Sequence, residues 1–96
     1  MKRQDTALQR ALGRLLMAIQ AEEMRALDTP AWSATHAALG RAETLYWSAK
    51  HASLQATLGE LSVRQYLGLE WLSRHPRVLP ALQELDLSLD DIADQA

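Results

Sequence analysis

The chain has 96 residues, of which 48% are hydrophobic, and its formal net charge is −2 at pH 7. This length suits one domain with a modest core, and the slight negative charge argues against non-specific binding of nucleic acid by the whole surface. The chain contains no cysteine, which excludes disulfides, thiolate nucleophiles and cysteine-bound metals. Leucine and alanine dominate while phenylalanine is absent, so we expect a single all-α domain over residues 1–96.

The first predicted helix covers residues 7–27. Thr6 and Gln9 match a capping box, in which each side chain satisfies a backbone N–H at the start of the helix. Its apolar face comprises Leu8, Leu12, Leu15, Leu16 and Ile19. Thr29 suits an N-cap and Pro30 suits the first position of a new helix. Because the break between the two helices is short, we expect them to form an antiparallel hairpin.

The second predicted helix covers residues 30–58 and is apolar on two sides. One side is a heptad seam of mostly small residues: Thr35, Ala38, Ala42, Leu45, Ala49, Ala52, Ala56 and Gly59. Small side chains let another backbone approach closely. Two alternatives stay open for the seam: it packs against the first helix inside the monomer, or it meets another chain. A helix with two apolar faces needs neighbours on both, so we expect it to be the central element.

Two shorter helical regions are predicted after it, over residues 63–74 and 80–94. Ser62 and Gln65 form a second capping box, and His75-Pro76 ends the first of these regions. The second region reads as two short helices, because Ser88 resembles a new N-cap. The sequence does not decide whether the helices over 30–58 and 63–74 are separate or continuous through Gly59. The predicted fold is a small all-α bundle of four to five helices built on a long antiparallel hairpin.

The central helix carries the residues that we expect at a partner or dimer interface. These are Leu39, Ala42, Tyr46, Trp47, Ala49 and Leu54. Trp32 lies on the polar side near the start of that helix, so we expect it to be an exposed anchor.

Charged residues of opposite sign gather at the two ends of the chain. Arginines form a stripe on the first helix, away from its leucines: Arg3, Arg10, Arg14 and Arg25. They are candidate contacts to nucleic-acid phosphates, although a solvated helix face has the same pattern. The C-terminal region contains Glu84, Asp86, Asp90, Asp91 and Asp94. These acids either face solvent or pair with the arginine stripe.

Patterns typical of catalysis or metal binding do not appear. His36 and His51 share a helix but not the i,i+3 or i,i+4 spacing that lets two histidines bind one ion, and His75 stands apart. The four glycines are isolated, so they form no phosphate-binding loop. We therefore predict no enzymatic activity, no metal site and no cofactor.

These observations favour a small protein–protein interaction module: a regulator, adaptor or inhibitor that self-associates as a homodimer through its central helix. The alternative is a nucleic-acid-binding transcriptional regulator that uses the arginine stripe. The composition is typical of a bacterial or phage protein. We expect a cytoplasmic location, because the N-terminal segment lacks the apolar core of a signal peptide and no stretch is long enough to span a membrane.

Overall fold

In a computed structural model the chain forms an elongated helical bundle measuring 44 × 21 × 21 Å. The structure describes residues 3–51 and 53–95, and the side chains of residues 7–51 and 53–89. Every regular element in these ranges is helical, which confirms the predicted all-α class. The elements are α1 (Arg3–Ala26), α2 (Trp32–Lys50), α3 (Leu54–Leu58), α4 (Val63–Leu67), α5 (Leu69–Ser73), the 3-10 helix η1 (Pro76–Val78) and α6 (Leu79–Gln95).

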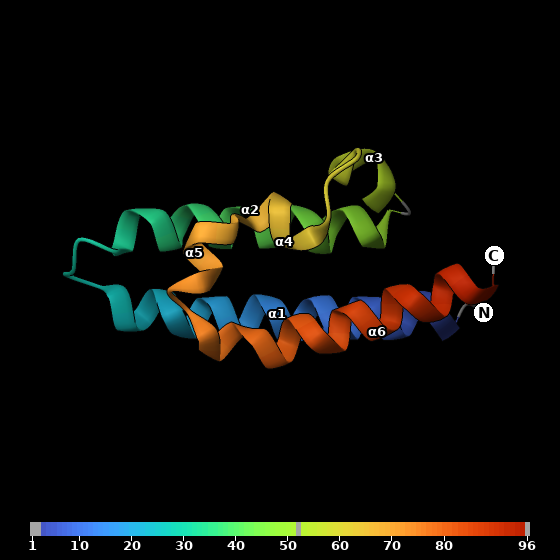
Figure 1. Cartoon of the computed structure of the whole chain (residues 1–96), viewed down its shortest axis with the longest axis horizontal. Coiled ribbons are helices and arrows are strands. Elements are labelled where there is room, and N and C mark those ends of the chain that lie inside the picture. Colours follow the sequence, from blue (N-terminus) through green and yellow to red (C-terminus); the bar gives the residue numbers. More distant parts are fainter. Residues whose placement is uncertain (1–2, 52, 96) are drawn as a thin grey trace.

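The α1–α2 hairpin carries the fold, and α6 runs back along α1, while α3, α4 and α5 lie on the side of α2 (Figure 1). Large side chains from all the long helices are fully buried between them: Leu12, Leu15, Ile19, Leu45, Leu82 and Leu85. Burial of this apolar surface is the main favourable contribution to folding. In the part of the chain that is described, no helix is both long and apolar enough to cross a membrane.

The small-residue seam of α2 lies inside the monomer. Thr35, Ala38, Ala42 and Leu45 are all buried, and α1 is the helix that packs most extensively against α2. The leucines of α1 fill the space that these small side chains leave, so two backbones approach closely. This part of the seam is therefore used for contact within the chain, whereas Ala56 and Gly59 are exposed and Ala52 lies outside the described residues.

The hairpin turn differs in detail from the prediction. Thr29 donates from its backbone N–H and its hydroxyl to the Ala26 carbonyl, at 2.9 and 2.6 Å, and so closes the end of α1. Its hydroxyl also accepts from the Ala31 N–H at 3.2 Å, but the N-cap of α2 is Ala31, not Thr29, and no side chain caps this helix. The helix itself begins at Trp32, two residues after Pro30.

The second helix is shorter than the predicted span of 30–58. It ends at Lys50, and α3 follows as a separate helix of five residues. Ser53 turns the chain, because its N–H and its hydroxyl both donate to the Ser48 carbonyl, at 2.8 and 3.2 Å. Gly59 then ends α3 at a positive φ of 62°. The helices over 30–58 and 63–74 are thus separate.

The C-terminal half also corrects two predicted elements. The capping box of Ser62 and Gln65 is present, but the helix predicted over 63–74 is divided into α4 and α5 at Gly68, whose φ is 114°. Residues 80–94, predicted as two short helices, belong to the single helix α6. Ser88 does not start a new helix, because Leu82, Leu85 and Leu89 continue one apolar face along α6 and pack into the core.

Candidate functional site

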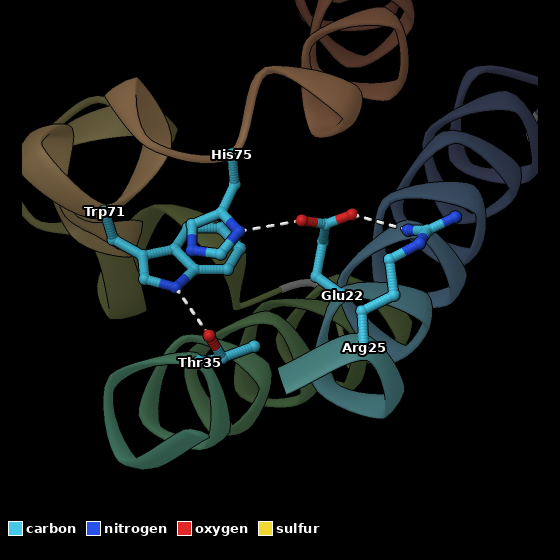
Figure 2. A network of polar contacts seen from close by, with 5 residues as sticks. All are labelled: Glu22, Arg25, Thr35, Trp71 and His75. Atoms are coloured by element: carbon cyan, nitrogen blue, oxygen red, sulfur yellow. Dashed lines mark hydrogen bonds and ion pairs between the residues drawn. The ribbon is translucent and has the colours of Figure 1, made fainter. Parts of the chain in front are cut away.

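A buried hydrogen bond between Glu22 and His75 joins the last turns of α1 to the link between α5 and η1 (Figure 2). His75 donates from Nδ1 to Glu22 Oε1 at 2.7 Å, and Arg25 donates from Nη1 to Glu22 Oε2 at 2.7 Å. The Glu22 and His75 side chains are only 8% and 15% exposed. Both carboxylate oxygens therefore have a cationic or N–H partner, as burial of a carboxylate requires.

Trp71 holds the imidazole of His75 in place. The two rings are stacked with centroids 4.2 Å apart and planes inclined by 19°. The indole Nε1–H donates to Thr35 Oγ1 at 3.1 Å, so the buried indole N–H is satisfied by α2. This network, which we call the Glu22 network, comprises Glu22, Arg25, Thr35, Trp71 and His75 and links α1, α2 and α5.

The electrostatics of the Glu22 network favour an ionised Glu22. Burial alone would raise the pKa of this carboxyl, because it removes water from the charged form. The hydrogen bond and charge of His75, with the charges of Arg25 and Arg77, outweigh burial and lower the pKa of Glu22 below its ordinary value. The carboxylate is consequently a fixed negative charge at neutral pH.

A second, more exposed arrangement repeats the same chemistry one residue along α1. Glu23 Oε2 accepts from His36 Nδ1 at 2.6 Å, and the His36 ring stacks on Trp32 with centroids 4.8 Å apart. In both cases the histidine follows its tryptophan by four residues, which places the two side chains on one side of the chain. This repeated Trp-x-x-x-His spacing is the signal in the sequence for both stacks.

An open pocket of about 400 Å³ lies beside the Glu22 network. Three arginines border it: Arg25 from α1, Arg74 from the end of α5, and Arg77 from η1. Glu22 and His75 contribute to its lining, together with the small apolar residues Ala26, Ala31 and Pro76. The α1–α2 turn and the α5–η1 link thus bring together charges that are about fifty positions apart in the sequence.

The residues predicted as an interface on the central helix are mostly internal. Leu39, Ala42 and Leu54 are buried, and Tyr46 and Ala49 are partly buried against the core. Trp47 is the exception in this set, with 55% of its surface exposed. The ammonium of Lys50 lies 4.9 Å from the centre of its ring, at a distance typical of cation–π contact. Whether these residues meet a partner stays a prediction.

Two of the four candidate nucleic-acid contacts already carry ion pairs. Arg14 pairs with Glu84 of α6, and Arg25 pairs with Glu22. Arg10 is exposed, whereas the side chain of Arg3 lies outside the described residues. One acidic residue of α6, Glu84, therefore faces the basic side of α1. The side chains of Asp90, Asp91 and Asp94 also lie outside the described residues.

Asp86, the remaining acid of the predicted acidic cluster, pairs with Arg64 of α4 at 2.5 Å. The acidic residues of α6 that are described thus form contacts within the fold, one toward α1 and one toward α4. These pairs are partly exposed, so each contributes little to stability and depends on salt.

The outward side of α1 exposes an apolar surface that the sequence analysis did not identify. Met17 and Met24 are 65% and 73% exposed, and Leu27, just after α1, is exposed as well. Ala21 lies between the two methionines and is exposed. We call these four residues the α1 outer face, of which Met17, Ala21 and Met24 lie on the side of the helix opposite the core leucines. The heptad spacing of the two methionines was the available signal.

Among the described residues, no group of three or more histidine, aspartate or glutamate side chains is arranged to hold a metal ion. The predictions of no enzymatic activity and no cofactor are not tested by the geometry. No protein-family model, curated protein or solved structure matches this chain. Its function therefore has to be inferred from its own surface.

Proposed function

We propose that the chain is a small protein-binding module and that the α1 outer face is its docking surface. The observation that carries this proposal is the exposure of Met17 and Met24, at 65% and 73%, on a helix whose other side forms the core. An exposed apolar surface on a small protein commonly marks an interaction site. By occupying a partner's surface, such a module acts as a regulator, adaptor or inhibitor.

The geometry of the α1 outer face suits an apolar groove or helix on the partner. Met17, Ala21 and Met24 follow the i, i+4, i+7 spacing of helices that dock through one face. Methionine is flexible and polarizable, so it adapts to the shape of an opposing surface. No ion pair of the described residues involves these side chains, so docking breaks none of the pairs that hold the fold.

Trp32 lies at the start of α2, just after the hairpin turn, and its exposure supports its expected role as an anchor. Glu23 contacts His36, and Trp32 stacks on His36, so this tryptophan lies on the Glu23 side of α1. Trp32 remains 38% exposed despite the stacking, so a partner can reach it.

The α1 outer face replaces the central helix in this proposal because α2 uses most of its apolar residues inside the monomer. Self-association as a homodimer is one form of the proposal, in which the second copy is the partner. The nucleic-acid alternative has less support, since Glu84 and Glu22 offset the charges of Arg14 and Arg25.

Light scattering over a concentration series first establishes whether the partner is a second copy of the chain. Site-specific photo-cross-linking in the cells that make the protein then identifies any other partner. A cross-linking residue at Met24 is expected to trap the partner, and one at Gln83, an exposed position on α6, is not. Equal trapping at both positions would contradict the proposal.

Affinity for the trapped partner, or for the second copy, is then measured with charged variants. The double variant Met17→Glu/Met24→Glu is expected to weaken the complex at least about 100-fold, because each glutamate must be desolvated on binding. Gln83→Glu adds the same kind of charge elsewhere and is expected to have no effect. Full affinity in a double variant that keeps its helical circular dichroism would overturn the proposal.

A further inference from the structure

The pocket beside the Glu22 network concentrates positive charge on a chain whose formal net charge is −2. Its lining includes three arginines, Arg25, Arg74 and Arg77, and one acidic residue, Glu22. Both oxygens of this carboxylate are already engaged, by His75 and Arg25. The three arginines, which we call the rim of the pocket, therefore have more N–H donors than Glu22 can engage.

The three arginines differ in how firmly they are held within the fold. Arg25 uses Nη1 for Glu22, but a guanidinium has five N–H donors and the side chain is 54% exposed. Arg74 pairs with Glu70 at 3.3 Å, between two side chains that are both largely exposed, so water weakens this pair. Arg77 has no ion pair among the described residues, although its charge contributes to the lowered pKa of Glu22.

The remaining lining and the size of the pocket limit the ligand further. A volume of about 400 Å³ lies at the lower end of the range for small-molecule sites. Ala26, Ala31 and Pro76 provide apolar surface, while Glu22 in the lining repels a second anion placed next to it. A ligand that fits both conditions has an anionic group at the arginine rim and a compact uncharged body.

We propose that this pocket binds a small organic anion, whose phosphate or carboxylate group is held by Arg74 and Arg77 with Arg25. Guanidinium groups bind both oxyanions through paired N–H donors, so the two classes share one recognition chemistry. This site goes beyond the proposed protein-binding role. It does not include Met17, Ala21, Met24 or Leu27, which form the α1 outer face.

Nuclear magnetic resonance titrations of the intact chain with phenyl phosphate, benzoate and inorganic phosphate test the proposal. The ring protons of His75 and the indole N–H of Trp71 report on the pocket, and the rings of His36 and Trp32 serve as the matched control within the same molecule. We expect saturable shifts at His75 with phenyl phosphate or benzoate, and little change at His36. The tighter of the two probes identifies the class of anion.

Inorganic phosphate is expected to bind at least fivefold more weakly than the better aromatic probe, because it leaves Ala26, Ala31 and Pro76 uncovered. Equal affinity for inorganic phosphate would contradict the proposal that the uncharged part of the ligand contributes to binding. Shifts that do not saturate, or that are as large at His36 as at His75, would overturn the proposed site.

Variants of the rim assign the binding groups. Arg77→Ala and Arg74→Ala are each expected to weaken the better probe about tenfold, whereas Arg10→Ala, at an exposed arginine on α1 away from the pocket, is expected to leave it unchanged. The Trp71 indole signal verifies that each variant keeps the Glu22 network. Unchanged affinity in a folded Arg74→Ala/Arg77→Ala double variant would rule out recognition by these arginines.

Discussion

At the residue scale, Glu22 is a buried carboxylate whose negative charge has to be compensated by neighbouring groups. Its side chain is 8% exposed, so the carboxylate has lost most of its water. His75 and Arg25 replace that water with one hydrogen bond to each oxygen. Removal of either partner would leave a buried charge incompletely compensated, which is costly in a protein interior. The stacking of Trp71 on His75 keeps the imidazole where Glu22 needs it.

The lowered pKa of Glu22 predicts acid-sensitive stability. A glutamate in the unfolded chain has a pKa of about 4.3, so below that pH the unfolded state binds a proton more readily than the folded state. The stabilisation by Glu22 is therefore complete above this pH and is lost as the pH falls through the folded pKa. Urea unfolding at a series of pH values between about 3 and 7 measures this loss.

Glu22→Gln is expected to flatten that pH dependence and to lower the free energy of unfolding at pH 7 by about 1–3 kcal/mol. Glu23→Gln is the matched control, since Glu23 also pairs with a histidine but is more exposed, and its effect is expected to be smaller. An unchanged acid dependence in Glu22→Gln would show that another group is responsible.

Sequence reasoning could not place these side chains together, because the Glu22–His75 contact spans 53 positions. Only the local half of each arrangement is visible in the sequence, namely the four-residue spacing of Trp71 and His75 and of Trp32 and His36. Local spacing predicts which rings stack on one side of a helix. It does not predict which carboxylate of a distant helix will meet them.

At the element scale, the hairpin is recovered, but the helices predicted over 30–58 and 63–74 are each divided, and α1 begins at Arg3, before the predicted cap at Thr6. The capping box at Ser62 is a strong local signal and starts α4 as expected. The end of α2 instead depends on Ser53, which bonds back to Ser48 only after the chain has turned. The apparent cap at Ser88 is overridden because the apolar face of α6 continues through it. Tertiary packing thus decides boundaries where local signals are equivocal.

Two glycines in different backbone conformations give opposite predictions. Gly68 has a φ of 114°, which side-chain-bearing residues rarely adopt, so Gly68→Ala is expected to destabilise the fold by at least about 1 kcal/mol. Gly40 lies inside α2 with open space around an added Cβ, so Gly40→Ala is expected to stabilise it by about 0.5–1 kcal/mol. Thermal or urea unfolding of both variants measures these changes. If Gly68→Ala were as stable as Gly40→Ala, the strain assigned to the α4–α5 break would be wrong.

At the scale of the whole molecule, different sides of α1 contact different surroundings. Its leucines face α2 and α6, Glu22 and Arg25 face the pocket, and the methionines face outward. The hairpin could be predicted because its break is short and its apolar pattern is regular. The expectation that the C-terminal helices pack on the central helix is wrong for α6, because its apolar face meets the leucines of α1. Its leucines pack mainly against α1, and Glu84 adds an ion pair there.

This arrangement predicts that α6 is part of one cooperative core and does not unfold by itself. Leu82 is fully buried, so Leu82→Ala is expected to lower the free energy of unfolding by about 2–5 kcal/mol. The same substitution at Leu87, which is 67% exposed on the same helix, is expected to change it by less than about 0.5 kcal/mol. The total for a domain of this size is about 5–15 kcal/mol, so Leu82→Ala removes a large part of it.

Urea unfolding followed by far-ultraviolet circular dichroism and by tryptophan fluorescence tests this cooperativity. The three tryptophans lie outside α6, at positions 32, 47 and 71, so fluorescence reports on the rest of the bundle. If the core is shared, Leu82→Ala shifts both transitions to the same lower urea concentration. If α6 merely docks on a stable hairpin, the fluorescence transition stays in place while part of the helical signal is lost early. The continuous burial of Leu82 and Leu85 against Leu12, Leu15 and Ile19 favours the first outcome.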